Sequence, residues 1–360
     1  MAARYGRPTS PSNIRALRQM AIALLATACL PGCAAKPGDN ARADTPVEIR
    51  LGYFANLTHA QALLGVASGE FANAVSPHTL TTRVFNAGPS AIEALFAGEV
   101  DLCYIGPGPA LSGFEKSRGE ALRVVAGAAA NGVVIVASPN SAIQSMSDLA
   151  GKRIATPQMG NTQDIAARHY VIHELKQPNA DNILAIPNAE QVAMMSRGQI
   201  DAAWAPEPWG ERLVQEAGGR IIMEERELWP NKTFVLTVVI ARTEFLQQHP
   251  DVVQRLLGAH AQWTTRLQND APSYLLQVEQ AMFDLTGKRL ASSVLGNAMS
   301  RISFTNDPMQ ETFAAISRWS LDLGFSKAKP DLAKLVDTQL LHQAVEATAA
   351  SAPQPGGVRQ

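Results

Sequence analysis

Short polar loops after predicted strands are the segments of this chain whose residue types best suit ligand chemistry. They occupy residues 55–58, 86–90, 106–109, 160–164 and 205–209. In open parallel sheets, ligands bind beyond the carboxyl ends of the strands, where helix N-termini present unpaired N–H groups. Ser90 stands at one predicted helix start, and Asn161 and Thr162 stand at another. Donors from two opposed helix ends could hold a small oxyanion without a lysine or arginine, although each side chain could also serve only as a helix cap.

Aromatic and acidic residues near the last of these loops have alternative roles. Trp204 is expected in the core, because a single aromatic near a strand end usually packs there. Trp209 follows a Pro-Glu-Pro turn and either walls a cleft or packs against the helix after it. Glu207 either faces the cleft or forms an exposed ion pair with Arg212 or Arg220.

Patterns for metal, nucleotide or catalytic chemistry are weak in this sequence. His169 and His173 have the i, i+4 spacing of helical metal ligands, but no HExxH glutamate lies between them and no acidic partner is evident. The sequence has no G-x-S-x-G elbow and no P-loop, and Gly106-Pro107-Gly108 lacks the later glycine of a dinucleotide fingerprint. We therefore expect no metal, no cofactor and no enzyme activity.

One helix–strand–loop unit occurs twice in the chain and supplies the elements that position these loops. Residues 92–109 (IEALFAGEVDLCYIGPGP) and 192–208 (VAMMSRGQIDAAWAPEP) share a helical stretch ending at glycine, then an aspartate, a short strand with an aromatic, and a loop with prolines. The similarity extends upstream to residues 49–62 and 153–166, each a strand, a polar loop and a helix start. Two similar α/β lobes predict a cleft between them, and so a binding protein.

The order of predicted elements sets the domain boundaries. Strands alternate with helices in βαβ units, which is typical of a mostly parallel sheet. We expect the first part of lobe 1 at residues 47–136, lobe 2 at 137–235, a return to lobe 1 followed by C-terminal helices at 236–348, and a disordered tail at 349–360. Because the chain crosses between the lobes twice, hinge strands are expected near residues 133–137 and 235–241.

The N-terminus has the features of an export signal. Arg15 and Arg18 precede an apolar run that is too short to span a bilayer, and Cys33 follows Leu30-Pro31-Gly32, which resembles a bacterial lipobox. We expect a lipoprotein signal peptide at residues 1–32, a lipidated Cys33 as the membrane anchor, and a flexible tether at 33–46. The alternative is secretion of a soluble periplasmic protein without the lipid.

Composition fits a globular, exported chain and excludes nucleic acid as a partner. The 360 residues are 46% hydrophobic and 18% charged, which suffices for two lobes with their own cores. Removal of residues 1–32 leaves 27 basic and 32 acidic residues, a net charge of −5, so no basic field remains. Only Cys33 and Cys103 survive processing, which excludes a disulfide framework and makes Cys103 a buried hydrophobe.

Four runs of sequence resemble a known family, the substrate-binding proteins of ABC importers for nitrate, sulfonate and taurine, and within it the aliphatic sulfonate-binding group. They are FNAGPSAIEALFAGEVDLCYIGPGPA, SDLAGKRIATPQMGNTQD, GQIDAAWAPEPWGERL and EFLQQHPDVV, and the resemblance covers about residues 47–270. It implies an α/β type II periplasmic-binding-protein fold, with two lobes joined by two crossing strands and a C-terminal helical extension. It also implies a monomer that delivers a small anionic solute to ABC permease and ATPase subunits.

Carried onto matching positions, the resemblance implies binding loops centred on Asn56, Thr58, Ser90, Gly108, Asn161, Thr162 and Glu207, to which we add Trp209 as a cleft wall. No arginine lies in these loops, so a sulfonate or nitrate held by neutral donors is favoured over an arginine-clamped carboxylate. An inward Glu207 would favour taurine, whose ammonium compensates the carboxylate. The alternatives are a neutral aromatic vitamin precursor of the pyrimidine or flavin type, and an enzyme on the same scaffold using His59, which lies beside a predicted cleft loop.

Overall fold

The computed structural model describes residues 46–351. The predicted signal peptide, Cys33, the tether up to residue 45 and residues 352–360 of the expected tail lie outside the described residues.

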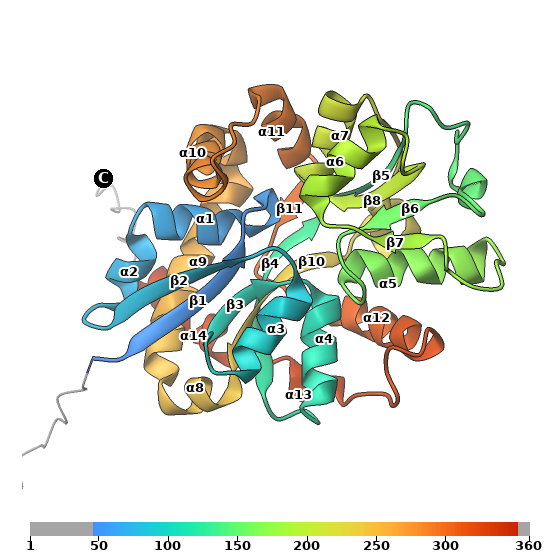
Figure 1. The fold of residues 1–360 in the computed structure, drawn as a ribbon. Helices are drawn as coiled ribbons and strands as arrows, with labels where there is room; N and C mark the ends of the chain where they lie inside the picture. Colours follow the sequence, from blue (N-terminus) through green and yellow to red (C-terminus); the bar gives the residue numbers. More distant parts are fainter. Residues whose placement is uncertain (1–45, 352–360) are drawn as a thin grey trace, which may run out of the picture. The chain divides into compact units, whose positions relative to one another are not determined.

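The described strands form two separate sheets (Figure 1). The first sheet has the order β11-β4-β10-β3-β1-β2, and the second has the order β7-β6-β8-β5-β9. The strands of the first are β1 (Glu48–Phe54), β2 (Thr79–Phe85), β3 (Leu102–Ile105), β4 (Leu122–Asn131), β10 (Val235–Arg242) and β11 (Ile302–Phe304). Those of the second are β5 (Val133–Ala137), β6 (Ile154–Thr156), β7 (Ile183–Ala185), β8 (Ala202–Pro206) and β9 (Arg220–Glu224).

The two sheets confirm the internal repeat seen in the sequence. Each has a parallel core of three strands in the same order, β2-β1-β3 in one and β7-β6-β8 in the other. Beside each core lies an antiparallel strand from a crossing segment, β10 next to β3 and β5 next to β8. The expectation of mostly parallel sheets was wrong for this reason, because the strands that follow each crossing enter antiparallel and make both sheets mixed.

An arginine–aspartate pair fastens the repeated unit in each lobe. The Nε of Arg50 donates to Asp101 at 2.8 Å, and the Nε of Arg153 donates to Asp201 at 3.0 Å. Asp101 also accepts from Arg242 on the returning strand β10 at 2.9 Å. The aspartate that the sequence repeats is therefore a structural anchor of the first parallel strand in both lobes.

The two crossings lie slightly outside the strands expected to contain them. β4 passes into β5 at Asn131 and Gly132, whose positive φ of 72° suits glycine. The return from β9 to β10 runs through two short turns, Glu225–Leu228 and Pro230–Lys232. β5 pairs on both sides within the second sheet and β10 on both sides within the first, so the segments that connect the two sheets lie next to the predicted hinge strands at 133–137 and 235–241 and not within them. The bends between lobes lie at 131–132 and 225–234 instead.

Helices cover both sheets and continue beyond β10 as an extension. Those preceding the return are α1 (Ala60–Ala67), α2 (Glu70–Val75), α3 (Gly88–Phe96), α4 (Pro107–Lys116), α5 (Thr162–His169), α6 (Asn188–Ser196) and α7 (Trp209–Ala217). Those following it are α8 (Thr243–Gln248), α9 (Pro250–Asp270), α10 (Leu275–Thr286), α11 (Ser292–Met299), α12 (Gln310–Asp322), α13 (Leu332–Leu335) and α14 (Gln339–Ser351). Short turns lie at Leu57–His59, Met146–Leu149, Tyr170–Glu174 and Ala271–Tyr274.

The extension contacts both lobes (Figure 1). α12 packs against α4 of the first lobe and α5 of the second, and α11 packs against α7. The short strand β11 joins β4, and α14 continues to Ser351, so residues 349–351 are helical rather than part of a disordered tail. Across residues 46–351, each helix is too short or too polar to span a membrane.

Candidate functional site

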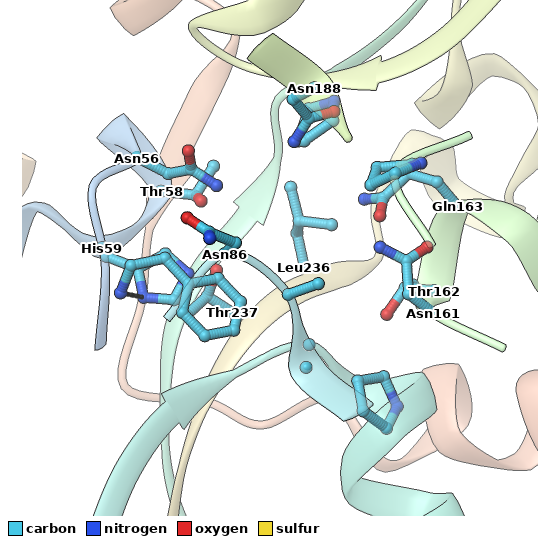
Figure 2. Close-up of a pocket in the computed structure, with 17 residues that line it drawn as sticks. Asn56, Thr58, His59, Asn86, Asn161, Thr162, Gln163, Asn188, Leu236 and Thr237 are labelled. Atoms are coloured by element: carbon cyan, nitrogen blue, oxygen red, sulfur yellow. Dashed lines mark hydrogen bonds between the residues drawn. The ribbon is translucent and has the colours of Figure 1, made fainter. Parts of the chain in front are cut away.

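A small chamber lies where the carboxyl ends of the parallel strands of both lobes meet, and it is the candidate site. It has a cavity volume of ≈ 40 Å³, room for roughly three water-sized groups. Figure 2 shows polar side chains of the two lobes on opposite sides of this space, with Asn188 above and Leu236 between the two groups. The lining comprises Phe54, Asn56, Thr58, His59, Asn86, Ala87, Gly88, Gly106, Pro109, Leu236 and Thr237 from the first lobe, and Pro157, Asn161, Thr162, Gln163, Asn188 and Pro206 from the second.

The chamber lining carries no lysine, arginine, aspartate or glutamate among the residues that the structure describes. Its only titratable side chain there is His59, which is 2% exposed and whose Nδ1 accepts from the backbone N–H of Phe54 at 3.3 Å. Burial lowers the pKa of His59 to about 3, so its ring is neutral at physiological pH. Any charge within the chamber must therefore arrive with a ligand.

Helix starts from both lobes supply partial positive charge to the chamber. Gly88 is the first residue of α3, Thr162 of α5 and Asn188 of α6, and all three line the space. The first N–H groups of a helix lack an intrahelical partner, and the helix dipole favours an anion beside them. Three helices from two lobes thus aim at one point, which suits a small oxyanion.

Several polar side chains of the lining are free to meet a ligand. Within residues 46–351, the side chains of Thr58, Asn86, Gln163 and Thr237 form no hydrogen bond to the protein. The Oδ1 of Asn188 is buried without a partner. Asn86 is exposed and can meet water, but Thr58, Gln163 and Thr237 are buried. Because buried polar groups are usually paired, these unpaired groups around one cavity point to a polar ligand.

The structure brings four of the predicted site residues together at the chamber. Asn56, Thr58, Asn161 and Thr162 all line it and are at most 9% exposed. Asn161 also caps α5, since its Oδ1 accepts from the backbone N–H of Asp164 at 3.1 Å. Asn161 is therefore a helix cap whose side chain also borders the candidate site.

Ser90 and Gly108 lie outside this lining. The hydroxyl of Ser90 donates to the carbonyl of Ala87 at 2.8 Å, as a helix-start residue can, and the residue is exposed. The N–H of Gly108 donates to the Oγ1 of Thr162 at 3.2 Å, which joins the two lobes. A Cβ at Gly108 would lie 3.1 Å from the backbone nitrogen of Thr162, so a small residue permits this approach. The Thr162 hydroxyl keeps its own proton to donate into the chamber.

Glu207 faces neither the chamber nor Arg212, and both alternatives considered for it were wrong. It is 0% exposed, and its carboxylate accepts from Arg301 at 2.7 Å and from the backbone N–H of Glu211 at 2.9 Å. Arg301 also pairs with Glu211 at 2.9 Å. Burial raises the pKa of Glu207 to about 7, against the lowering by that N–H and by Arg301. Glu207 therefore gives no reason to favour taurine as the ligand.

We call Glu207, Glu211 and Arg301 the latch, because they join the lobes beside the chamber. Both glutamates lie at the junction of β8 and α7 in the second lobe, whereas Arg301 directly precedes β11 of the first sheet. Asn297 of α11 adds a hydrogen bond to Glu211 at 2.9 Å. The latch is thus a buried ionic contact between lobes, made entirely from protein groups.

Trp209 lines a larger groove next to the chamber, and its indole also joins the lobes. Its Nε1 donates to the Oδ1 of Asn56 at 2.8 Å, and the guanidinium of Arg212 lies 4.3 Å from the centre of its ring. The groove has a volume of ≈ 680 Å³ and shares Asn56 and Asn86 with the chamber lining. Trp204, by contrast, is fully buried in the core as predicted, and so is Cys103.

Sequence reasoning missed Asn86, Gln163, Asn188 and Thr237 as individual site residues. Asn188 was missed with its whole loop, because the short strand β7 was not predicted. The internal repeat held part of the signal, because both asparagines stand near the start of the helix that follows the second strand of a lobe. Asn86 is the first residue after β2, and Asn188 is the first residue of α6.

Comparison with known sequences finds similarity to a described family and to several binding proteins. The sequence pattern described as the NMT1-like family matches residues 42–275. A protein of Brucella abortus (strain 2308), provisionally named a binding protein, is 26% identical over 59% of this chain and 64% of its own length. The taurine-binding periplasmic protein of Escherichia coli (strain K12) is 26% identical over 49% of this chain and 53% of its own length. A Bacillus subtilis (strain 168) protein, provisionally named an aliphatic sulfonates-binding protein, is 24% identical over 88% and 93%.

Solved structures with the same fold include both binding proteins and an enzyme. The periplasmic nitrate-binding protein NrtA of Synechocystis PCC 6803 aligns with a TM-score of 0.71 at 16% identity, over 86% of this chain and 93% of that one. The periplasmic aliphatic sulphonate-binding protein SsuA of Escherichia coli has a TM-score of 0.64 at 17% identity, over 81% and 92%. The desulfurization enzyme DSZB has a TM-score of 0.60 at 16% identity, over 83% and 99%. At these identities the likeness establishes the α/β periplasmic-binding-protein fold and no more.

Proposed function

The chain belongs to the NMT1-like family, and we propose that it is the solute-binding component of an ABC importer that takes a small oxyanion of the nitrate or organosulfonate class. The observation that carries this proposal is the chamber. It offers helix N-termini and neutral amide and hydroxyl donors to a space that, among the described residues, is lined by no charged side chain.

Neutral donors suit an anion that must be released to a partner. Charge-assisted hydrogen bonds are stronger than neutral ones, so several amide and hydroxyl donors can hold an oxyanion without a salt bridge. A carboxylate at the same place would repel it. Glu207, which directly follows the lining residue Pro206, and Glu211 are both engaged by Arg301. The proposal is supported by relatives whose names include taurine-binding and aliphatic sulfonates-binding proteins.

The size of the chamber favours a compact anionic head. Its ≈ 40 Å³ accommodate a nitrate or the head of a sulfonate, whereas an aromatic ring is too large for this closed arrangement. The adjoining groove of ≈ 680 Å³ includes Trp209, Leu285 and Lys288 and could take the organic tail of a sulfonate. We therefore infer that the head binds in the chamber and any tail extends into the groove. This size argument counts against the vitamin-precursor alternative.

An enzyme on this scaffold would need a reactive group at the chamber, and the described lining supplies a poor one. His59 is buried and neutral, and no carboxylate or thiol of the described residues lines the space beside it. Cys103 is buried in β3, and burial raises the pKa of its thiol, which disfavours the nucleophilic thiolate. We propose a binding protein without enzyme activity.

We further propose that the protein acts on the periplasmic side of the cell envelope, anchored through lipid on Cys33, as a monomer that docks on permease and ATPase subunits. The lipobox-like sequence before Cys33 supports the anchor. Replacement of Cys33 by Ser should abolish metabolic labelling with a fatty acid. If the variant is labelled and cleaved like the wild type, the anchor proposal is wrong.

A thermal-shift screen tests the proposed ligand class. The panel contains nitrate, ethanesulfonate, taurine, a phosphonate and a pyrimidine vitamin precursor, each added to the purified protein. A ligand that binds only the folded state at a hundredfold excess over Kd stabilises it by about 2.7 kcal/mol. We expect nitrate or a sulfonate to raise Tm and the pyrimidine to leave it unchanged. A shift with the pyrimidine alone would contradict the proposal.

A further inference from the structure

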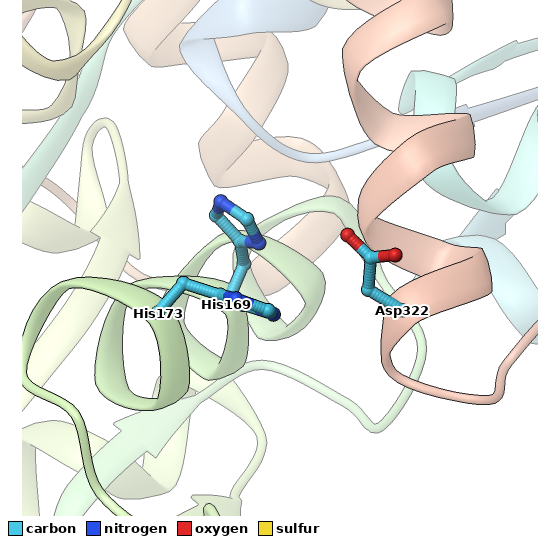
Figure 3. Close-up of side chains that lie close together, drawn as sticks. All are labelled: His169, His173 and Asp322. Carbon is cyan, nitrogen blue, oxygen red and sulfur yellow. The ribbon is translucent and has the colours of Figure 1, made fainter.

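Two histidines and an aspartate from different parts of the chain lie together away from the chamber. His169 ends α5, His173 lies in the π-helical turn Tyr170–Glu174 that follows it, and Asp322 ends α12. One potential ligand atom from each lies within 4.8 Å of the other two. Figure 3 shows the two imidazoles on one helical segment with the carboxylate of Asp322 facing them from the neighbouring helix. The acidic partner that the sequence did not reveal is thus supplied by the fold.

The ring nitrogens of this cluster lack protein partners. The Nδ1 of His169 and the Nε2 of His173 are both buried, and neither has a hydrogen-bond partner among the described residues. Most buried polar side-chain atoms in proteins are paired, so two such atoms in one cluster call for an explanation. Protonation of both rings does not explain the missing partners, because the rings lie only 4.5 Å apart and two imidazolium charges would repel one another. A bound cation would give both nitrogens a partner.

The donor set selects among cations. Two imidazole nitrogens and one carboxylate oxygen suit zinc and neighbouring transition metals, whereas calcium and magnesium prefer oxygen donors throughout. Zinc commonly has three protein ligands and a water when its site is open, and Asp322 lies at the exposed edge where water can enter. Arg318 is the cation near His169 that opposes a metal ion, while Glu174 and Asp322 are the anions near it that favour one.

The cluster also joins the two lobes. α5 belongs to the second lobe, whereas α12 is fixed to the first sheet at both ends, through β11 before it and a bridge between Val124 and Val336 after it. Trp319 of α12 stacks on His169 at 4.6 Å and contacts Trp229 of the second crossing at 4.8 Å. A metal here would bind α5 to α12 beside the hinge.

We propose that His169, His173 and Asp322 bind a divalent transition-metal ion of the zinc class and that this ion bridges the second lobe to α12. The site is separate from the anion chamber, so the proposal stands or falls independently of the ligand. Binding to residues from both sides of the hinge stabilises the arrangement in which they meet.

The test is metal binding by the full chain after chelator treatment and dialysis. Zinc affinity is measured by competition with a chromophoric chelator, and cobalt serves as a spectroscopic probe of nitrogen and oxygen coordination without a thiolate band. The variants are His173→Ala and Asp322→Asn, and the matched control is His342→Ala, an exposed histidine on α14. Circular dichroism in chelator confirms that each variant is folded, and Asp322 is exposed enough for its replacement to be tolerated.

We expect the wild type to bind one equivalent of zinc that both cluster variants weaken at least tenfold and that His342→Ala leaves unchanged. An absence of zinc uptake overturns the proposal. Uptake that is the same in wild type and His173→Ala overturns the site, and uptake that is the same in wild type and Asp322→Asn overturns the bridge to α12.

Discussion

The chamber and the latch both join the two lobes, but they do so with opposite electrostatics. The chamber gathers neutral polar groups and leaves several unpaired, whereas the latch buries charges that are all paired within the protein. A buried unpaired charge is far more costly than an unpaired amide or hydroxyl. The difference shows that charged side chains suit a contact between the lobes, where each charge has a partner. Neutral donors suit the ligand site, because they can remain unpaired at lower cost when no ligand is bound.

The largest expected effect comes from breaking the latch. Arg301→Met leaves Glu207 and Glu211 without their cation, and Glu207 is 0% exposed. Removal of one partner of a buried pair should lower the free energy of unfolding by about 3–5 kcal/mol, measured by urea denaturation. The control is Lys288→Met, which breaks a pair with Glu216 whose side chains are 52% and 32% exposed and should cost about 1 kcal/mol or less. Equal losses of unfolding free energy in the two variants would show that the latch contributes no more to stability than an exposed ion pair.

Glu225 sharpens the comparison, because it is a buried carboxyl held without a cation. Its oxygens accept from the indole N–H groups of Trp204 at 2.6 Å and Trp229 at 3.0 Å, and burial raises its pKa from 4.5 to about 7. A raised folded-state pKa means that the folded protein holds the proton more tightly than the unfolded chain. The resulting stability is present below pH 4.5 and is lost as pH rises through 7.

The corresponding measurement compares wild type and Glu225→Gln at a series of pH values. The wild type should lose about 3 kcal/mol of unfolding free energy relative to the variant between pH 4.5 and 8. The difference in unfolding free energy between the two proteins at each pH cancels the contributions of all other titrating groups. Parallel pH profiles would mean that the carboxyl of Glu225 is ionised in the folded protein and that its indole partners suffice to hold the charge.

In the chamber, the expected effect lies on affinity rather than stability. Gln163 is 4% exposed and unpaired, so Gln163→Leu removes a donor to the ligand without breaking a protein contact. Loss of one charge-assisted hydrogen bond should weaken anion binding by about 1.5–3 kcal/mol, roughly 10- to 100-fold. Calorimetric titration measures this, and Gln199→Leu on the exposed surface of the same lobe is the control. A drop in unfolding free energy with unchanged affinity would assign Gln163 to structure.

The smallest effect concerns the neutral contact between Trp209 and Asn56. Trp209→Phe removes the indole N–H that donates to Asn56 across the lobes at 2.8 Å. One neutral hydrogen bond contributes about 1 kcal/mol, so ligand affinity should fall several-fold through weaker closure. Trp263→Phe is a suitable control, because its buried indole N–H has no partner among the described residues. Affinity that falls equally in both variants would point to a general loss of packing.

The repeat explains how much of this arrangement could be predicted. The repeated glycine–aspartate unit identified two lobes, because the same strand order follows from the same pattern in each, and all five loops predicted from the sequence contribute residues to the chamber. The paired arginines also repeat, but Arg50 and Arg153 are one residue out of register in the alignment of the two upstream stretches.

What the sequence could not reveal depends on contacts between distant parts of the chain. Glu207 and Arg301 are 94 residues apart, and nothing in the local pattern links them. Glycine and proline signals show where the loop at 205–209 turns, but which way its acid points depends on the packing of the C-terminal extension. The same holds for Asp322, which reaches His169 and His173 only because α12 packs against α5.

The central claim is that neutral donors in the chamber bind an anion. The most direct test compares an anion with an uncharged compound of nearly the same shape. Nitrate and ethanesulfonate are titrated calorimetrically into the protein alongside ethyl methyl sulfone, which has nearly the shape of ethanesulfonate but no charge. We expect at least one anion to bind, the sulfone to bind at least 100-fold more weakly than ethanesulfonate if the sulfonate is the ligand, and Gln163→Leu to weaken the anion that binds. Sulfone affinity equal to that of ethanesulfonate, or no binding of either anion, would contradict the account.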